Sequence, residues 1–157
     1  MLVRTVRSLA LLATGLLAGA FGYGAANLVP TFDRVPLQMR LEFHTELMRN
    51  NSISMQATMA AAALSCLAAA VLAAGRHRLV AAAATVLVVA SFLITRLGNV
   101  PINHRINEWA VAGPAPDYAE ILARWDGFHV LRTGTALGAF ALIIALVLWM
   151  PADQPAR

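Results

Sequence analysis

The chain has 157 residues, of which 59% are hydrophobic and 13% are charged, whereas soluble domains are about 45–50% apolar and about 25% charged. This composition excludes a disordered chain and a soluble α/β enzyme, and a single cysteine, Cys66, excludes a disulfide-stapled secreted module. A pI of about 10.6 resembles a nucleic-acid signal, but a net charge of +4 does not provide a dense basic stripe. We therefore predict an integral membrane protein that has the lipid bilayer, and no nucleic acid, as its surroundings.

Four apolar stretches are long enough to cross the hydrocarbon core of a bilayer, which takes about 20 residues of helix. They cover residues 8–29, 54–75, 79–97 and 128–150. Because every backbone polar group must be paired inside lipid, each stretch is expected to be a helix. The predicted fold is all-α, a four-helix transmembrane bundle that forms a single membrane domain over residues 1–157.

The connections between these spans differ in length. Residues 75–78, Gly-Arg-His-Arg, form a tight turn between the second and third spans. Long loops follow the first span (residues 30–53) and the third span (residues 98–127). An even number of spans places both long loops on one side of the membrane, and the termini with the tight turn on the other.

The charges are distributed unevenly between the two sides. The side of the termini carries Arg4, Arg7, Arg76, Arg78 and Arg157, with Asp153 as its acid. The long-loop side carries Arg34, Arg40, Arg49, Arg96, Arg105, Arg124 and Arg132, with Asp33, Glu42, Glu46, Glu108, Asp117, Glu120 and Asp126. A strict count of arginines favours cytoplasmic long loops, but the first helix usually dominates orientation and its arginines have no acid beside them. We therefore predict a bacterial-type cell membrane with cytoplasmic termini.

The first span also has features of a signal peptide. It has a basic start, and Ala18-Gly19-Ala20 resembles a small-residue cleavage site. The apolar run continues to Val29, which is too long for an ordinary signal. A membrane span is the favoured interpretation.

Small residues indicate where helices approach closely in lipid. Gly15 and Gly19 form a GxxxG pair in the first span, and Gly134 and Gly138 form another in the fourth. Such pairs serve homodimers or packing inside one bundle. Packing is the favoured interpretation, and a homo-oligomer stays open.

Polar residues gather at the long-loop end of the predicted bundle. In the first loop, Arg40 and His44 share a helical face. The second loop begins Asn99-Val-Pro101-Ile-Asn103, and Pro101 predicts that the third helix ends or kinks there. Asn99 and Asn103 would flank that turn, where an asparagine either caps a helix or binds a ligand.

The densest group of candidate residues lies where the chain enters the fourth span. Trp125, His129 and Arg132 are spaced by four and three residues, which places them on one helical face. Asp126 is positioned to orient the imidazole. An ionisable group inside a span is a functional candidate, although a terminal arginine can also snorkel to the interface. Trp109 and Trp125 also suit an aromatic belt.

Two motifs resemble a known family, and they are Asn99-Val-Pro101-Ile-Asn103 and Trp125-x-x-x-His129-x-x-Arg132-Thr133. The family comprises small four-helix membrane proteins that include fungal anthrone oxygenases. Val29-Pro30 and His44 fit the same pattern, so the resemblance covers residues 9–149. It implies oxidation of an activated polycyclic aromatic by O2, without flavin or haem.

The resemblance also implies roles for the candidate residues. A neutral His129 or His44 would remove the acidic C–H proton of an anthrone. Donors would stabilise the enolate oxygen, and aromatic walls would enclose the rings; the residues implied are Arg132, Asn99 and Asn103 for the oxygen and Trp109 and Trp125 for the walls. No cofactor is expected, since the sequence lacks a flavin or dinucleotide glycine pattern.

Two other classes of function use the same residues. A copper or iron site would combine His44 and His129 with Glu46, Asp126 or His104. A non-enzymatic bundle would bind a lipid or quinone or stabilise a larger complex, and its cluster would be fully ion-paired with no cavity. The oxygenase instead requires a polar, ligand-sized pocket, capped by the two long loops, for a hydrophobic aromatic or lipid-like small molecule.

Overall fold

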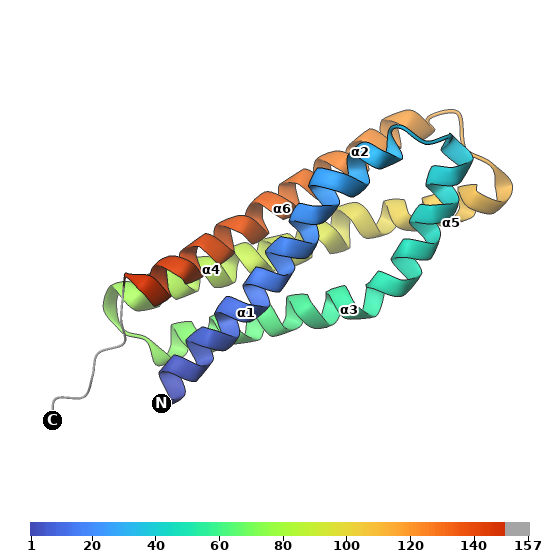
Figure 1. Ribbon diagram of the computed structural model, residues 1–157. Helices are drawn as coiled ribbons and strands as arrows, with labels where there is room; N and C mark the ends of the chain where they lie inside the picture. The colour runs from blue at the N-terminus through green and yellow to red at the C-terminus, as the bar shows by residue number, and fades with distance from the viewer. Residues whose placement is uncertain (150–157) are drawn as a thin grey trace, which may run out of the picture.

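The computed structural model describes residues 1–149 as a bundle of helices (Figure 1). Four helical spans in this range are long and apolar enough to cross a membrane, namely Leu2–Phe32, Leu37–Leu72, Gly75–Ala112 and Tyr118–Leu148. The predicted all-α, four-helix membrane fold is confirmed. The predicted end of the last span at Met150, and the charges of Asp153 and Arg157, lie outside the described residues.

Two of the four spans contain a π-helical segment. The first span consists of α1 (Leu2–Tyr23), the π-helix η1 (Gly24–Leu28) and α2 (Val29–Phe32). The third consists of α4 (Gly75–Ile94), the π-helix η2 (Thr95–Asn99) and α5 (Val100–Ala112). Val-Pro follows each π-helix, and because proline donates no N–H and crowds the preceding turn, a local π-helix accommodates it. The chain stays helical through Pro101, so the predicted end of the helix there is wrong.

The other two spans are single helices, α3 (Leu37–Leu72) and α6 (Tyr118–Leu148). The connections predicted as long loops are wrong in extent, since only residues 33–36 and 113–117 are non-helical. Their charged residues lower the hydropathy without breaking the helix. At the usual rise per residue, α3 is roughly 54 Å long, so it extends well beyond a hydrocarbon core of about 30 Å.

The connection between α3 and α4 is shorter than predicted. Only residues 73–74 are non-helical there, and Gly75 begins α4 with a positive φ of 51°. Arg76, His77 and Arg78 are therefore in the first turn of α4. This connection lies at the end that holds the N-terminus, and the α2–α3 and α5–α6 connections lie together at the other end, as predicted (Figure 1).

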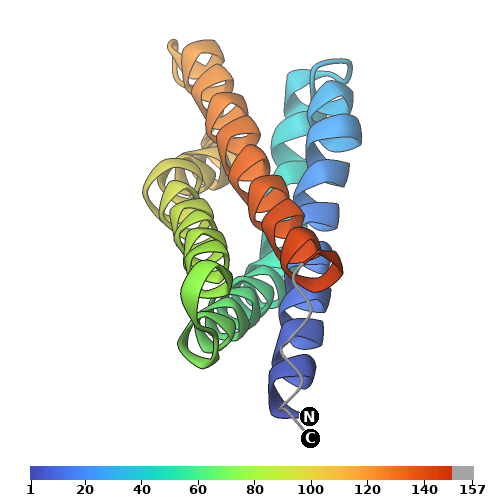
Figure 2. The ribbon, with the colours of Figure 1, turned by 90° about the vertical axis from the view of Figure 1, so that its left-hand side faces the viewer.

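The helices pack as antiparallel neighbours. Helix α1 contacts α3 and α6, and α4 contacts the same two helices. Figure 2 shows α6 running obliquely between α4 and α1. Two apolar cores result: an alanine-rich core in the membrane-spanning part, which includes the fully buried Cys66, and an aromatic core at the end of the longer connections, which includes Phe32, Trp109 and Trp125.

The GxxxG pairs are used inside the bundle through one glycine each. A Cβ on Gly15 would come within 3.1 Å of the Phe140 ring, and a Cβ on Gly138 within 3.2 Å of Leu87. The positions of Gly19 and Gly134 have no such neighbour in the described chain. Close packing within the bundle therefore accounts for one glycine of each pair, Gly15 and Gly138.

Candidate functional site

A group of polar side chains, most of them buried, lies beside the aromatic core, to which Trp125 itself belongs. We define the histidine–tryptophan cluster as His44 of α3, Asn103 of α5, and Trp125, His129 and Arg132 of α6. His44 is fully buried, and Trp125, His129 and Arg132 are 3–7% exposed. The structure thus brings together residues that are up to 88 positions apart in the chain.

Trp125 lies between the two imidazoles. Its ring is stacked on that of His129, with centroids 5.2 Å apart and planes 7° apart. It meets the ring of His44 edge-on at 4.7 Å. Phe32 packs on His44 at 5.3 Å and on Trp125 at 6.5 Å, and the rings of Phe21 and His129 meet edge-to-face at 6.1 Å.

Arg132 fixes the hydrogen-bonding state of His129. Its Nε and Nη2 lie 3.0 and 2.7 Å from Nδ1 of His129. A guanidinium group only donates hydrogen bonds, so Nδ1 accepts and the neutral imidazole carries its proton on Nε2. That Nε2 faces Gly24 of η1, where a Cβ would come within 2.8 Å of it.

Asn103 engages the N–H of His44, whereas Arg132 engages the lone pair of His129. The indole Nε1 of Trp125 donates to Oδ1 of Asn103 at 2.7 Å, which identifies that atom as the amide oxygen. Nε2 of His44 lies 3.1 Å from the same oxygen and therefore donates to it. In the neutral ring the lone pair is then on Nδ1, which is buried and has no hydrogen-bond partner among residues 1–149.

Arg132 is buried inside the bundle, so snorkelling does not explain it. It is 7% exposed, its Nη1 donates to Oγ1 of Thr95 at 3.4 Å, and its guanidinium lies 4.5 Å from the centroid of Phe21. A charged group is retained at this depth only with such partners. Arg132 therefore joins α6 to η2 and α1 while it holds His129.

Asn99 joins two helices instead of capping one. Its Nδ2 donates to the backbone carbonyl of Trp125 at 3.0 Å, and its Oδ1 is buried without a hydrogen-bond partner among residues 1–149. It stands at the N-cap of α5, where no side-chain capping bond is made. The side chain thus fastens η2 to α6 one turn before His129.

Asp126 contacts Arg40, so the expectation that it orients His129 is wrong. Nη2 of Arg40 lies 3.1 Å from a carboxylate oxygen of Asp126, and its Nη1 lies 2.9 Å from Asp33. Arg40, itself 7% exposed, also lies over the ring of Phe32 at 5.4 Å. Sequence reasoning placed Arg40 on the face of His44 but missed this role, in which one arginine joins α3, α6 and the end of α2.

The residues considered for a metal shell do not converge on the imidazoles. Glu46 forms an exposed ion pair with Arg49 at 3.1 Å, and His104 is exposed on α5. Asp126 is bound to Arg40. Within residues 1–149, no group of three or more histidine, cysteine or acidic side chains is arranged to hold a metal ion.

Neither Trp109 nor the cavity between α3 and α4 belongs to the cluster. Trp109 is buried in the aromatic core beneath Arg105, whose guanidinium lies 5.1 Å from the ring centroid. An open cavity of about 450 Å³ lies between α3 and α4, and none of its lining residues belongs to the cluster. The cavity therefore does not correspond to the polar pocket predicted under the loops.

Sequence reasoning also missed three residues that enclose the cluster. Phe21, Gly24 and Phe32 come from the first span and meet His129 or His44. One sequence signal could have indicated that the first span contributes to the site. Val29-Pro30 repeats the Val-Pro pair that ends at Pro101, and that second pair directly follows the candidate residue Asn99. Both Val-Pro pairs follow the π-helices that approach α6.

The fold and the cluster together define a class of protein: a small bundle of four membrane-type helices with a buried imidazole pair oriented by arginine and asparagine. A family model described as anthrone oxygenase matches residues 43–142, which include every member of the cluster. The chain therefore belongs to the anthrone oxygenase family. Comparison with curated proteins and with solved structures gives no match.

Proposed function

We propose that this chain is a membrane-embedded, cofactor-independent oxygenase that acts on an activated aromatic, an anthrone or a similar quinol-like compound. Membership of the anthrone oxygenase family supports the class of reaction. The observation that carries the proposal is the opposite hydrogen-bonding state of the two imidazoles, since His44 presents a lone pair at Nδ1 and His129 has its Nδ1 occupied by Arg132. One ring is thus suited to accept a proton and the other to donate a hydrogen bond.

In this mechanism His44 is the general base. Its Nδ1 takes the proton from the acidic carbon of the anthrone, and the electron pair of the broken C–H bond is delocalised onto the carbonyl oxygen. The N–H of His129 and the guanidinium of Arg132 stabilise that negative charge. The sequence left either His129 or His44 as the base, and the proposal assigns this role to His44.

O2 is the oxidant and supplies the new oxygen atom. The carbanion transfers electrons to O2, a carbon–oxygen bond forms, and the resulting hydroperoxide loses water to leave the quinone carbonyl. One anthrone and one O2 thus give one anthraquinone and one water. The balance requires no further reductant, so the proposed reaction needs no resident cofactor.

The two asparagines have a positioning role in this mechanism. The amide oxygen of Asn103 accepts hydrogen bonds from both Trp125 and His44. The proton of the neutral His44 ring is therefore on Nε2, and the lone pair is on Nδ1. Asn99 is bound to the backbone of α6. An enolate oxygen needs an N–H donor, and Nδ2 of Asn99 already donates to the carbonyl of Trp125. The proposal therefore gives the oxygen-holding role to His129 and Arg132.

Oxygen uptake by the purified protein with an anthrone tests the proposal, after subtraction of uncatalysed oxidation. His44→Ala is expected to lower the rate by about 10²–10⁴-fold, the usual contribution of a general base. His129→Ala is expected to lower it as well, because the developing negative charge loses a donor. His104→Ala is the matched control, since that histidine is exposed on α5. A His44→Ala protein that oxidises anthrone at the parent rate would exclude His44 as the base.

Close packing of the cluster supports a second candidate, a non-enzymatic bundle that binds a lipid or quinone or stabilises a larger complex. Each of the five rings of the cluster and its phenylalanine neighbours lies 4.7–6.1 Å from at least one of the others. The same experiment separates the two candidates. Unchanged oxygen consumption on addition of the protein, across a set of anthrones and quinols, would favour the non-enzymatic function.

We also propose that the termini are cytoplasmic. Arg4 is exposed near the N-terminus, at the same end as Arg76 and Arg78, and basic residues favour the cytoplasmic side. Cys66 is fully buried, so Cys66→Ser provides a background for single-cysteine labelling. In intact cells, a membrane-impermeant maleimide is expected to label His104→Cys and not Arg4→Cys. The reverse pattern would place the termini outside.

A further inference from the structure

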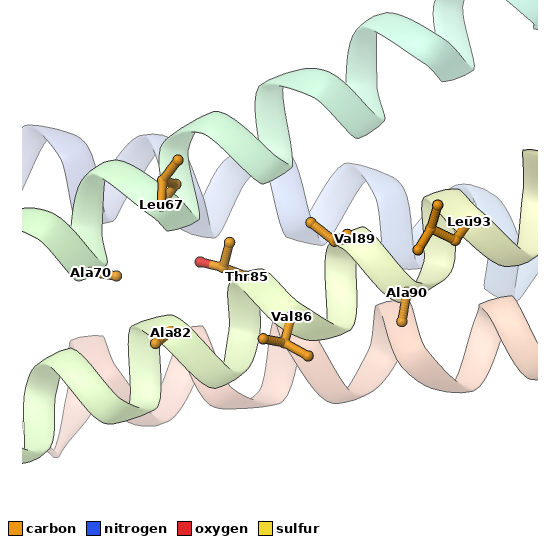
Figure 3. A pocket seen from close by; sticks show the side chains of 8 residues that line it. All are labelled: Leu67, Ala70, Ala82, Thr85, Val86, Val89, Ala90 and Leu93. Carbon is orange, nitrogen blue, oxygen red and sulfur yellow. The ribbon is translucent and has the colours of Figure 1, made fainter.

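A groove runs along the outer side of the α3–α4 pair in the membrane-spanning part of the bundle (Figure 3). Its volume is about 450 Å³, and Thr85 is its one polar lining residue among apolar ones; the lining consists of Leu67, Ala70, Ala82, Thr85, Val86, Val89, Ala90 and Leu93. From Ala82 to Leu93 it extends roughly 16 Å along the axis of α4 at the usual rise per residue. The groove has the length and the apolar character of a bound hydrocarbon chain.

The groove faces away from the histidine–tryptophan cluster. Its residues Val86, Val89 and Leu93 are 65%, 42% and 47% exposed. By contrast, Ser91 is fully buried and donates to the backbone carbonyl of Arg132 on α6. The two sets of residues occupy different faces of α4, so the groove opens toward lipid and does not lead to the cluster.

An arginine stands at the end of the groove near the α3–α4 connection. Arg78 precedes Ala82 by one helical turn, and the series 78, 82, 85, 89, 93 follows one face of α4. Nε of Arg78 donates to the carbonyl of Ala73 at 2.9 Å, the C-cap of α3 and the next position on the Leu67–Ala70 face. The guanidinium is therefore held across the gap between the two helices, where the groove ends.

No acidic side chain neutralises Arg78 in the described chain. The acidic residues among 1–149 lie at positions 33–46 and 108–126, at the opposite end of the bundle. Arg78 is exposed, its two terminal nitrogens have no protein acceptor among residues 1–149, and Arg76 is two residues away. A positive group that is held by one nitrogen and open at the others is suited to bind a phosphate.

We propose that this groove is a binding site for one anionic phospholipid, with an acyl chain along α4 and the headgroup phosphate on Arg78. The apolar lining accounts for the chain, and the arginine at its membrane-surface end accounts for the negative headgroup. Basic residues near the ends of spans attract anionic lipids, each with an effect of about 1 kcal/mol, which corresponds to about a five-fold change in affinity. The site is separate from the cluster and independent of the proposed oxygenase.

Native mass spectrometry of the full-length protein tests this site, with phosphatidylglycerol and phosphatidylcholine of identical acyl chains as probes. The parent protein is expected to retain one phosphatidylglycerol more strongly than phosphatidylcholine. Arg78→Ala is expected to weaken phosphatidylglycerol about five-fold and to leave phosphatidylcholine unchanged. Ala90→Phe fills the groove and is expected to weaken both lipids, and Ala82→Leu provides a second, milder filling.

Arg4→Ala is the matched control, because Arg4 is an exposed arginine at the same end and does not border the groove. Equal retention of the two lipids, or equal losses in Arg78→Ala and Arg4→Ala, would overturn the proposal. Displacement of the lipid by inorganic phosphate alone would mean that the site binds a free anion. A protein dimer that Ala90→Phe abolishes, regardless of lipid, would mean that a second copy occupies the groove.

Discussion

The two π-helices, η1 and η2, invite a direct comparison because the chain builds them alike. Each has five residues and is followed by Val-Pro. Each also presents a glycine to α6 at a distance that excludes a side chain: a Cβ would lie 2.8 Å from Nε2 of His129 at Gly24, and 2.6 Å from the Phe128 ring at Gly98. Both segments therefore use a missing side chain to bring their backbone close to an aromatic ring of α6.

The two π-helices differ in what they contribute beyond this close approach. In η2, Asn99 is fully buried and donates to the backbone of Trp125. In η1, Asn27 is exposed and donates only within its own helix, to Tyr23 at 3.4 Å. The second π-helix is thus hydrogen-bonded to α6, whereas the first lies against the His129 ring without such a bond. Similar local sequences thus give two different segments. The segment η2 is hydrogen-bonded to α6, and η1 packs against His129 of the candidate site.

The largest effect on stability is expected from Gly98→Ala. The new Cβ would overlap the body of the Phe128 ring, where three ring atoms lie within 2.6–2.9 Å, and overpacking of this kind costs about 1–3 kcal/mol. Thermal unfolding in detergent measures the loss. Gly134→Ala is the control, since no atom lies within 4 Å of its Cβ position. Adding Phe128→Ala should restore much of the stability, and a double variant no more stable than Gly98→Ala would contradict the proposed overlap.

Gly24→Ala is expected to act on activity more than on stability. The new Cβ would push the His129 ring from its stacked position, and the misplacement of a reacting group by about 1 Å can lower a rate by on the order of a hundred-fold. Oxygen uptake with an anthrone is the measurement. Gly22→Ala, in the same span with open space around its Cβ position, should retain the parent rate. If Gly24→Ala and Gly22→Ala oxidised anthrone equally fast, η1 would not shape the site.

The smallest effects are expected from the paired asparagines. Asn99→Ala removes a buried hydrogen bond and is expected to lower the free energy of unfolding by about 1 kcal/mol. Asn27→Ala changes an exposed residue and is expected to have an effect within about 0.5 kcal/mol. Denaturation of both variants under identical conditions tests the difference between the π-helices. Equal destabilisation would show that η2 is not fastened through its asparagine.

Hydropathy and helical spacing predicted much of this molecule. The four spans follow from runs of about 20 apolar residues, and the Trp125–His129–Arg132 face follows from offsets of four and three. Both inferences use local information along a single helix. The helical extent of residues 37–53 was missed, because the charged residues that end an apolar run do not end a helix.

The partners of the candidate residues could not be predicted, because they depend on contacts between helices. Asp126 is three residues from His129 along α6, yet Arg40 of α3 binds it. The closure of His129 by Gly24 requires the depth of α1 relative to α6, which no spacing in the sequence encodes. Hydropathy identifies the spans but contains no information about the position of each helix along the axis of its neighbour.

The two-residue link at 73–74 divides the described chain into two helical hairpins, and each imidazole of the cluster belongs to a different one. His44 comes from the hairpin of α1 and α3, and His129 from the hairpin of α4 and α6. Each hairpin contains two spans and one histidine of the pair, so two separately expressed fragments could insert alone but would acquire the cluster only on association. The candidate site therefore forms between the two hairpins in the way that a subunit interface forms between two chains. Its assembly depends on the alanine-rich surface through which the two hairpins pack.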